Sequence, residues 1–142
     1  MIELTINGIP KPKQSVRFTK RGIRYKSKDV VIYERSIRTQ VNTQIPKGFK
    51  ILDEPVAAYV TYVFPIPSSF SLKKKEFIKN GGVIYKDTKP DLIDNLNKAL
   101  FDALQGIVLI NDSRVCDFSA KKIYGFIPRA EIKISPIENT WM

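Results

Sequence analysis

The run of residues 56–64 constrains the fold more than any other segment of this chain. Its sequence, VAAYVTYVF, consists almost entirely of β-branched, aromatic and small apolar residues. Such a run is typical of a strand in the middle of a sheet. Pro65 and Pro67 end it, because proline lacks the amide that a sheet ladder needs. We therefore expect a sheet that has residues 56–64 as a central strand.

Four further segments have the apolar alternation or the β-branched content of strands. They are residues 2–6, 107–110, 115–123 and 130–134. The first is the clearest, because Ile2, Leu4 and Ile6 alternate with polar residues and the Asn7-Gly8 pair then predicts a turn.

Three segments have the periodicity of helices, at residues 30–44, 71–78 and 92–105. In the first, Tyr33, Ile37 and Val41 recur every four residues. The last begins after Asp91, a candidate N-cap, and ends before Gly106, a candidate left-handed C-cap. At 142 residues and 43% hydrophobic content, the chain suits one domain, 1–142, with one core. We predict an α/β (α+β) fold, a compact domain with a mixed sheet of four or more strands and two to three helices.

The composition excludes several classes of enzyme. The chain contains no histidine, which rules out Ser-His-Asp and Cys-His triads and histidine-ligated zinc. The single cysteine, Cys116, cannot form an internal disulfide, and its position in a predicted strand suggests a small buried hydrophobe. No apolar run approaches the ~20 residues that cross a bilayer, and no leader opens the chain. We expect a soluble, cytoplasmic protein with no membrane partner.

Acidic residues gather in the helix predicted at residues 92–105, although the net charge of the chain is +10. On a wheel of ~100° per residue, five apolar residues share one face and should pack on the sheet. These are Ile93, Leu96, Leu100, Ala103 and Leu104. The opposite face carries Asp91, Asp94, Lys98 and Asp102. A basic chain attracts polyanions, which clustered carboxylates would repel unless they held Mg²⁺.

An ordinary structural explanation also exists for these acidic residues. Asp91 and Asp94 occupy positions where carboxylates commonly cap a helix, and Asp94 with Lys98 forms a common i,i+4 pair. Asp112 lies in Asn111-Asp112-Ser113, which is typical turn composition.

Four short motifs, in a fixed order, add to this pattern. They are Lys89-Pro90-Asp91, Asp94-Asn95-Leu96-x-Lys98, Asp102-Ala103-Leu104-x-Gly106 and Asn111-Asp112-Ser113-x-Val115. Together they resemble the signature of the RusA family of Holliday junction resolvases, crossover junction endodeoxyribonucleases of the phage or prophage type. The family usually has one residue between its first two aspartates, whereas Leu92 and Ile93 separate Asp91 from Asp94 here. A tight bend at these two residues could restore the position of Asp91.

The resemblance implies a Mg²⁺-dependent endonuclease that cuts four-way DNA junctions as a homodimer, in recombination and repair. It implies that Asp91, Asp94 and Asp112 are the metal ligands and that Lys98 contacts the scissile phosphate, which makes these four the catalytic residues. Carboxylate-bound Mg²⁺ can supply such chemistry without histidine. Asn95 is a candidate neighbour of the ligands. Asp117 could assist, or could be an exposed strand residue.

Basic residues concentrate in residues 11–38, which hold ten Lys or Arg against two acidic residues. Phe18 and Tyr25 lie among them and could stack on unpaired bases. We predict an extended basic arm that contacts the DNA backbone. Its DNA-binding residues are Lys11, Lys13, Arg17, Lys20, Arg21, Arg24, Lys26 and Lys28. The alternative is a solvated loop. A second patch, Lys73-Lys74-Lys75, is predicted to be an exposed helix face.

Three other functions fit parts of this pattern. They are a non-catalytic basic nucleic-acid-binding module, a metal-dependent nuclease for other DNA or RNA structures, and a structural protein of a nucleoprotein particle. Cleavage of four-way-junction DNA in Mg²⁺, tested beside Asp94→Asn, distinguishes them from a junction resolvase.

Overall fold

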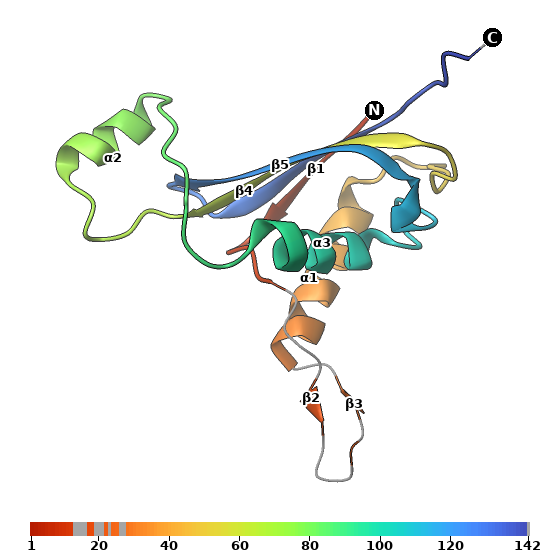
Figure 1. Ribbon diagram of the computed structural model, residues 1–142, viewed down its shortest axis with the longest axis horizontal. Helices are drawn as coiled ribbons and strands as arrows, with labels where there is room; N and C mark the ends of the chain where they lie inside the picture. Colours follow the sequence, from red (N-terminus) through yellow and green to blue (C-terminus); the bar gives the residue numbers. More distant parts are fainter. Residues whose placement is uncertain (13–16, 19–21, 23, 26–27, 142) are drawn as a thin grey trace. The chain divides into compact units, whose positions relative to one another are not determined.

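A computed structural model describes residues 1–141 of the chain, apart from residues 13–16, 19–21, 23 and 26–27 (Figure 1). Within these residues the class is α+β, with a four-stranded mixed sheet, a two-stranded ribbon and three α-helices. This confirms the predicted fold class. The contacts within the chain group it into two compact units. The sheet unit comprises residues 1–10, 54–89 and 113–142, and the helical unit comprises residues 11–53 and 90–112.

The sheet has the strand order β1-β6-β4-β5. Its strands are β1 (Ile2–Asn7), β4 (Val56–Pro65), β5 (Val115–Gly125) and β6 (Arg129–Pro136). β4 runs parallel to β5 and antiparallel to β6, and β1 is antiparallel to β6. The apolar run at 56–64 is therefore a central strand, as predicted. It carries buried residues on both faces, including Tyr62 and Val63.

The strand predicted at residues 107–110 is absent from the described residues. The amides of Ile107 and Val108 both donate to the carbonyl of Leu104, which folds this segment into a turn after the helix. Gly106 supports the turn with a φ of 83°, as its expected C-cap role requires. Leu109 then forms only isolated bridges, with Leu52 and Gln105.

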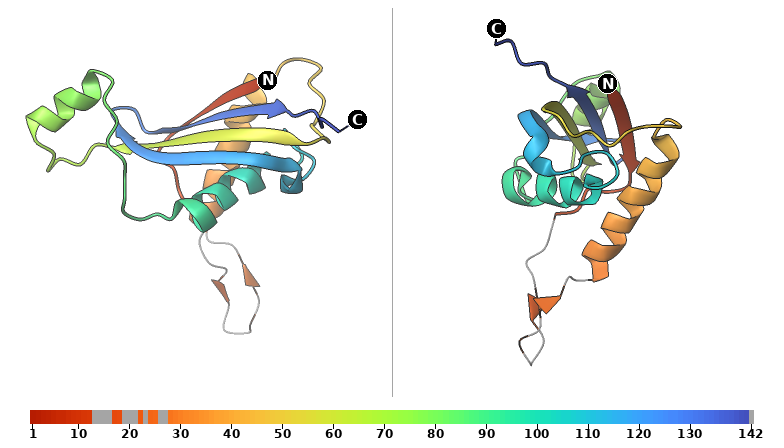
Figure 2. Two further views of the ribbon diagram at one scale, coloured as in Figure 1. Left: turned by 45° about the horizontal axis from the view of Figure 1, so that its top comes forward. Right: turned by 90° about the vertical axis from the view of Figure 1, so that its right-hand side faces the viewer.

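Helix α2 (Leu72–Lys79) belongs to the sheet unit and lies beyond the ends of β4 and β5 (Figure 2). The Ser71 side chain caps it by accepting from the amide of Lys74 at 3.2 Å. The chain then returns along β5. There the Lys86 amide donates to the carbonyl of Lys122, and the Tyr124 amide donates to the carbonyl of Ile84. This short pairing connects the α2 segment to the edge of the sheet.

The helical unit contains α1 (Lys28–Gln44), the π-helical turn η1 (Leu92–Leu96) and α3 (Asn97–Leu104). α1 buries Val30, Ile37 and Val41 and packs against α3. The helix predicted at residues 30–44 is therefore confirmed and begins two residues earlier. Among the residues that the structure describes, no helix combines the length and apolar character needed to cross a bilayer.

The predicted extended arm is partly a hairpin. Within the described residues, β2 (Arg17–Phe18) pairs antiparallel with β3 (Arg24–Tyr25). The sequence predicted an extended basic arm but not this pairing, because strands of two residues are too short to produce a recognisable pattern.

Candidate active site

The predicted site begins at the π-helical turn η1. The amide of Leu96 donates to the carbonyl of Asp91 at 3.0 Å, a bond that spans five residues where an α-helix spans four. One extra residue therefore fits within a single turn. Asp91 precedes the turn in an extended conformation, with φ −65° and ψ 132°. Turns of this kind occur often at functional sites.

The π turn explains why the helical wheel is wrong for Ile93. A uniform ~100° per residue groups Ile93 with the buried face. In the structure Ile93 is 83% exposed, whereas Leu96 is 1% and Leu100 is 0% exposed. Because of the extra residue, the side chains before Leu96 point in other directions than a regular helix that continues from α3 would give them. Ala103 and Leu104 are buried, as predicted.

The Asp91 carboxylate takes part in a side-chain contact instead of capping the helix. Its Oδ2 accepts a hydrogen bond from Asn95 Nδ2 at 3.3 Å. Asp91 occupies the N-cap position, but its side chain accepts no hydrogen bond from the backbone amides of the turn. Helix capping is therefore a poor explanation for an aspartate here. Asn95 therefore contacts one of the three predicted metal ligands.

Asp94 and Lys98 follow on the same helical segment. Asp94 lies inside η1, and its side chain falls outside the described part of the structure. Lys98 is the second residue of α3 and is exposed. The backbone thus places Lys98 one turn after Asp94, as predicted.

Asp112 lies beyond the other end of α3. It is exposed and opens a 3-10 turn, η2 (Asp112–Arg114). Leu109, three residues earlier, bridges to Gln105 at the C-terminal end of α3. Asp91 precedes η1, and Asp112 follows the end of α3, whose eight residues rise roughly 12 Å at ~1.5 Å each. Among the described side chains, no three acidic or cysteine residues form a group that could hold a metal ion. The assignment of the three aspartates as metal ligands stays a prediction.

Comparison with known proteins identifies the family. A family model described as Endodeoxyribonuclease RusA matches residues 7–135. The chain belongs to the RusA endodeoxyribonuclease family. A Bacillus subtilis (strain 168) protein, named Uncharacterized protein YqaN, is 32% identical over 143 residues, which cover 96% of each chain. The RusA match contains the four predicted catalytic residues and the basic arm, and it confirms the resemblance inferred from the motifs.

The basic arm lies within the RusA match but is only partly described. Lys11 and Lys28 are exposed, and the backbone of Arg17 and Arg24 belongs to the β2–β3 hairpin. The other predicted DNA-binding residues lie outside the described residues. They are Lys13, Lys20, Arg21 and Lys26. Their role as DNA contacts stays a prediction.

Tyr33 of α1 has a role that the sequence pattern did not indicate. Its hydroxyl forms a hydrogen bond with the backbone of Lys11, where the basic arm begins. Burial raises the pKa of Tyr33, and this hydrogen bond opposes the shift. The four-residue spacing identified Tyr33 as apolar but gave no sign of a partner so far along the chain.

Two predictions concern the start of β5. Asp117 is exposed, as the alternative of an exposed strand residue expects, and its role in the site stays a prediction. Cys116 is exposed and its thiol donates to the carbonyl of Arg114 at 3.4 Å, so the prediction of a buried hydrophobe is wrong. β5 is an edge strand, and its residues 116–119 all face solvent.

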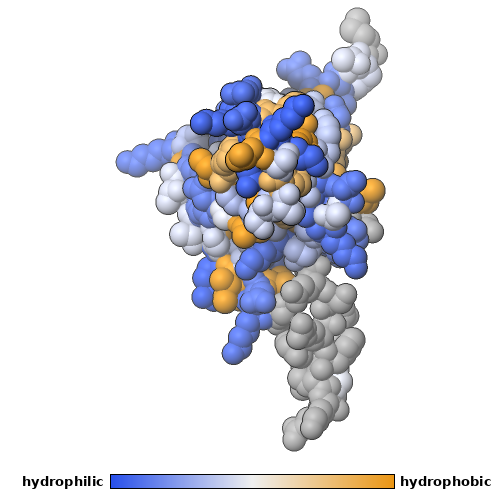
Figure 3. All heavy atoms as spheres, turned by 90° about the vertical axis from the view of Figure 1, so that its left-hand side faces the viewer, coloured by the Kyte–Doolittle hydropathy of each residue, from blue (hydrophilic) through white to orange (hydrophobic). Residues whose placement is uncertain are grey.

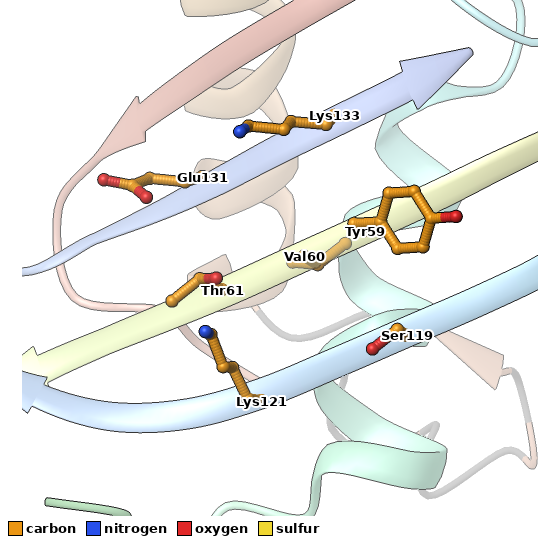
Figure 4. Close-up of a pocket in the computed structure, with 7 residues that line it drawn as sticks. All are labelled: Tyr59, Val60, Thr61, Ser119, Lys121, Glu131 and Lys133. Carbon is orange, nitrogen blue, oxygen red and sulfur yellow. The ribbon is translucent and has the colours of Figure 1, made fainter. Parts of the chain in front are cut away.

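The sheet of the sheet unit carries a groove. Figure 4 shows its lining side chains on three adjacent strands, β4, β5 and β6. They are Tyr59, Val60, Thr61, Ser119, Lys121, Glu131 and Lys133. None of the predicted catalytic residues lines it. The alternation of polar residues along these strands could have indicated this solvent-facing side of the sheet.

Proposed function

We propose that this RusA-family chain is a Mg²⁺-dependent endodeoxyribonuclease that resolves four-way DNA junctions and related branched DNA in recombination and repair. The family match supports DNA cleavage. The observation that carries the proposal to specific residues is the Asp91–Asn95 contact on the π turn. The Asp91 carboxylate is exposed, does not cap the helix, and lies at the start of the turn that contains Asp94.

The residues present fit a magnesium ion. Mg²⁺ prefers oxygen ligands, and carboxylates are the ligands this segment offers. When bound, Mg²⁺ neutralises phosphate charge and lowers the pKa of a coordinated water. Asp91 and Asp94 are the proposed ligands from one turn, and Asn95 orients the Asp91 carboxylate through its amide. Lys98, one turn later, contacts the scissile phosphate and stabilises the negative charge that develops on it.

A homodimer accounts for the position of Asp112. Within one chain, Asp91 and Asp112 flank opposite ends of the segment formed by η1 and α3. In a two-fold dimer, the partner's Asp112 can complete the ligand set, so each site forms only when two chains associate. Two matched sites also suit a four-way junction, which is itself close to two-fold symmetric and needs two cuts.

Cleavage of a labelled four-way junction in Mg²⁺ tests the proposal. We expect wild type and Glu138→Gln, a control that removes an exposed carboxylate from the C-terminal tail, to cut the junction. We expect Asp94→Asn to bind it and to cut at least 100-fold more slowly, a loss of roughly 3 kcal/mol of transition-state stabilisation. Binding without cutting by wild type would identify a non-catalytic module. Equal cutting of linear duplex or RNA hairpins would identify a different nuclease.

A further inference from the structure

The α2 end of the sheet unit carries rings and lysines that the proposed active site does not use. Residues 66–89 hold six lysines against two acidic residues. α2 buries none of its residues, so the sheet unit does not need this helix for its core. Figure 3 faces this end and shows hydrophobic side chains interleaved with hydrophilic ones. A helix without a buried face, rich in lysine, suggests a surface that contacts a ligand.

Aromatic rings hold two of the lysines in place. Lys74 Nζ lies 4.8 Å from the centroid of the Phe70 ring. Phe70 packs edge-to-face on Tyr124, with 5.1 Å between centroids. Lys86 Nζ lies 5.3 Å from the ring centroid of Phe64 and 5.4 Å from that of Tyr124. These cation–π contacts restrain the ammonium groups before any ligand binds, which lowers the entropy cost of binding.

Phe77 presents a supported ring on α2, the helix that also carries Lys74. It is 48% exposed, and its ring lies against Gly82, where a methyl group would enter the space of the ring. The Gly82 amide donates to the Phe77 carbonyl at 2.8 Å, which holds this chain reversal in place. Lys73 and Lys74 precede Phe77 by four and three residues and so share its side of the helix. A ring backed by glycine and flanked by lysines can stack on a nucleic-acid base.

We propose that the α2 end binds an unpaired strand of the branched DNA substrate. Phe77 stacks on a base, while Lys73, Lys74 and Lys86 contact phosphates. Rings set among lysines suit single strands, because every base offers a π face and every nucleotide a phosphate. A protein partner fits less well, since lysine is depleted at protein–protein interfaces. The identity of the ligand as DNA rests on the proposed nuclease function.

Binding of labelled oligonucleotides to the full chain, measured by fluorescence anisotropy in EDTA, tests this surface. For a 20-nucleotide oligothymidine, we expect Phe77→Leu to weaken binding about tenfold, the effect of one lost base stack, and Phe77→Trp to preserve it. Gly82→Ala displaces the ring and should match Phe77→Leu. Replacing Lys73 and Lys74 by glutamine should reduce the slope of log K against log salt by about 0.7 per lysine.

A matched duplex and a matched lysine are the controls. Phe77→Leu should weaken duplex binding less than about twofold, because paired bases cannot stack on the ring. Lys47→Gln removes the same charge from an exposed position of the helical unit and should leave the preference for single strands unchanged. Unchanged oligothymidine binding by a folded Phe77→Leu, or equal losses for both DNA forms, would overturn the proposal. No Mg²⁺ is present, so strand binding is scored independently of cleavage, and an inactive but strand-binding protein would refute the proposed nuclease alone.

Discussion

The amide of Leu96 donates to the carbonyl of Asp91 across five residues, at 3.0 Å. The RusA-like motif usually has one residue between its first two aspartates, and this chain has two, Leu92 and Ile93. The π turn accommodates the additional residue by widening one turn, and α3 continues regularly after it. Because Ile93 points to solvent, the insertion disturbs none of the packing of Leu96 and Leu100.

Deleting Ile93 should therefore be tolerated. The turn can then close with an ordinary four-residue bond, and little buried area is lost because Ile93 is exposed. We expect the free energy of unfolding to change by less than about 1 kcal/mol and junction cleavage to persist. Deleting Ala99 is the control, because α3 offers no widened turn to absorb it, and the deletion would rotate Leu100 and Leu104 by ~100° out of the core. Denaturant melts and cleavage assays measure both. A deletion of Ile93 as damaging as that of Ala99 would contradict this role of the π turn.

Asn95 should influence metal binding more than the chemical step. Its amide donates to Asp91 Oδ2, so it orients the carboxylate without needing to touch DNA. We expect Asn95→Ala to raise the Mg²⁺ concentration for half-maximal cleavage about tenfold, the usual cost of losing a residue that orients a metal ligand. The rate at saturating Mg²⁺ should stay near that of wild type. Asn42→Ala, which changes an exposed amide of α1, is the control. A lower maximal rate with an unchanged Mg²⁺ requirement would argue against an orienting role.

Tyr33 should make the folded protein less stable as the pH becomes alkaline. Burial raises the pKa of its hydroxyl above the ordinary 10.0. As the pH rises above 10, the unfolded chain releases this proton before the folded chain does. The stability that Tyr33 contributes is therefore complete below pH 10 and is lost as the pH rises through its folded pKa.

Denaturant melts at pH 9 and pH 11 check this dependence. Tyr33→Phe should lose about 1 kcal/mol at pH 9, because the hydrogen bond with the Lys11 backbone disappears. Between the two pH values, its free energy of unfolding should fall less than that of wild type. Tyr59→Phe, at an exposed tyrosine, should fall as wild type does. An equal fall for Tyr33→Phe and wild type would rule out the proposed proton linkage.

Regular periodicity allowed most of the fold to be predicted, and local irregularity explains the errors. Alternation identified β1, which buries every second residue, and the β-branched run identified β4, which is buried on both faces. The wheel of residues 92–105 was wrong at Ile93, because a wheel assumes a constant rotation per residue and the π turn does not provide it. The inserted residue itself was the available signal. The turn at residues 107–110 was missed because a run of four apolar residues resembles a strand. The sequence does not show that the first two of their amides bond to the carbonyl of Leu104 at the end of the helix.

The placement of Asp112 required three-dimensional information. Motif order puts Asp112 and Asp94 in one family pattern, but only the structure shows that they flank opposite ends of α3. Leu109 bridges to Gln105 at the end of the helix, and Asp112 continues from there. Sequence spacing cannot distinguish ligands that meet within one chain from ligands that meet between two.

Mixing two inactive variants distinguishes these possibilities. If each site combines Asp94 of one chain with the partner's Asp112, a mixed dimer of Asp94→Asn and Asp112→Asn contains one intact site and one site that lacks both residues. Each variant alone should be inactive, and the mixture should nick junctions in one strand, at up to about one quarter of the wild-type rate per site if subunits exchange randomly. Mixing Asp94→Asn with Lys98→Ala is the control, because both changes lie on the same helical segment and no intact site can form. Nicking in the first mixture alone would demonstrate a site shared between two chains. An inactive first mixture, with subunit exchange verified by differently tagged chains, would mean that all three aspartates act within one chain.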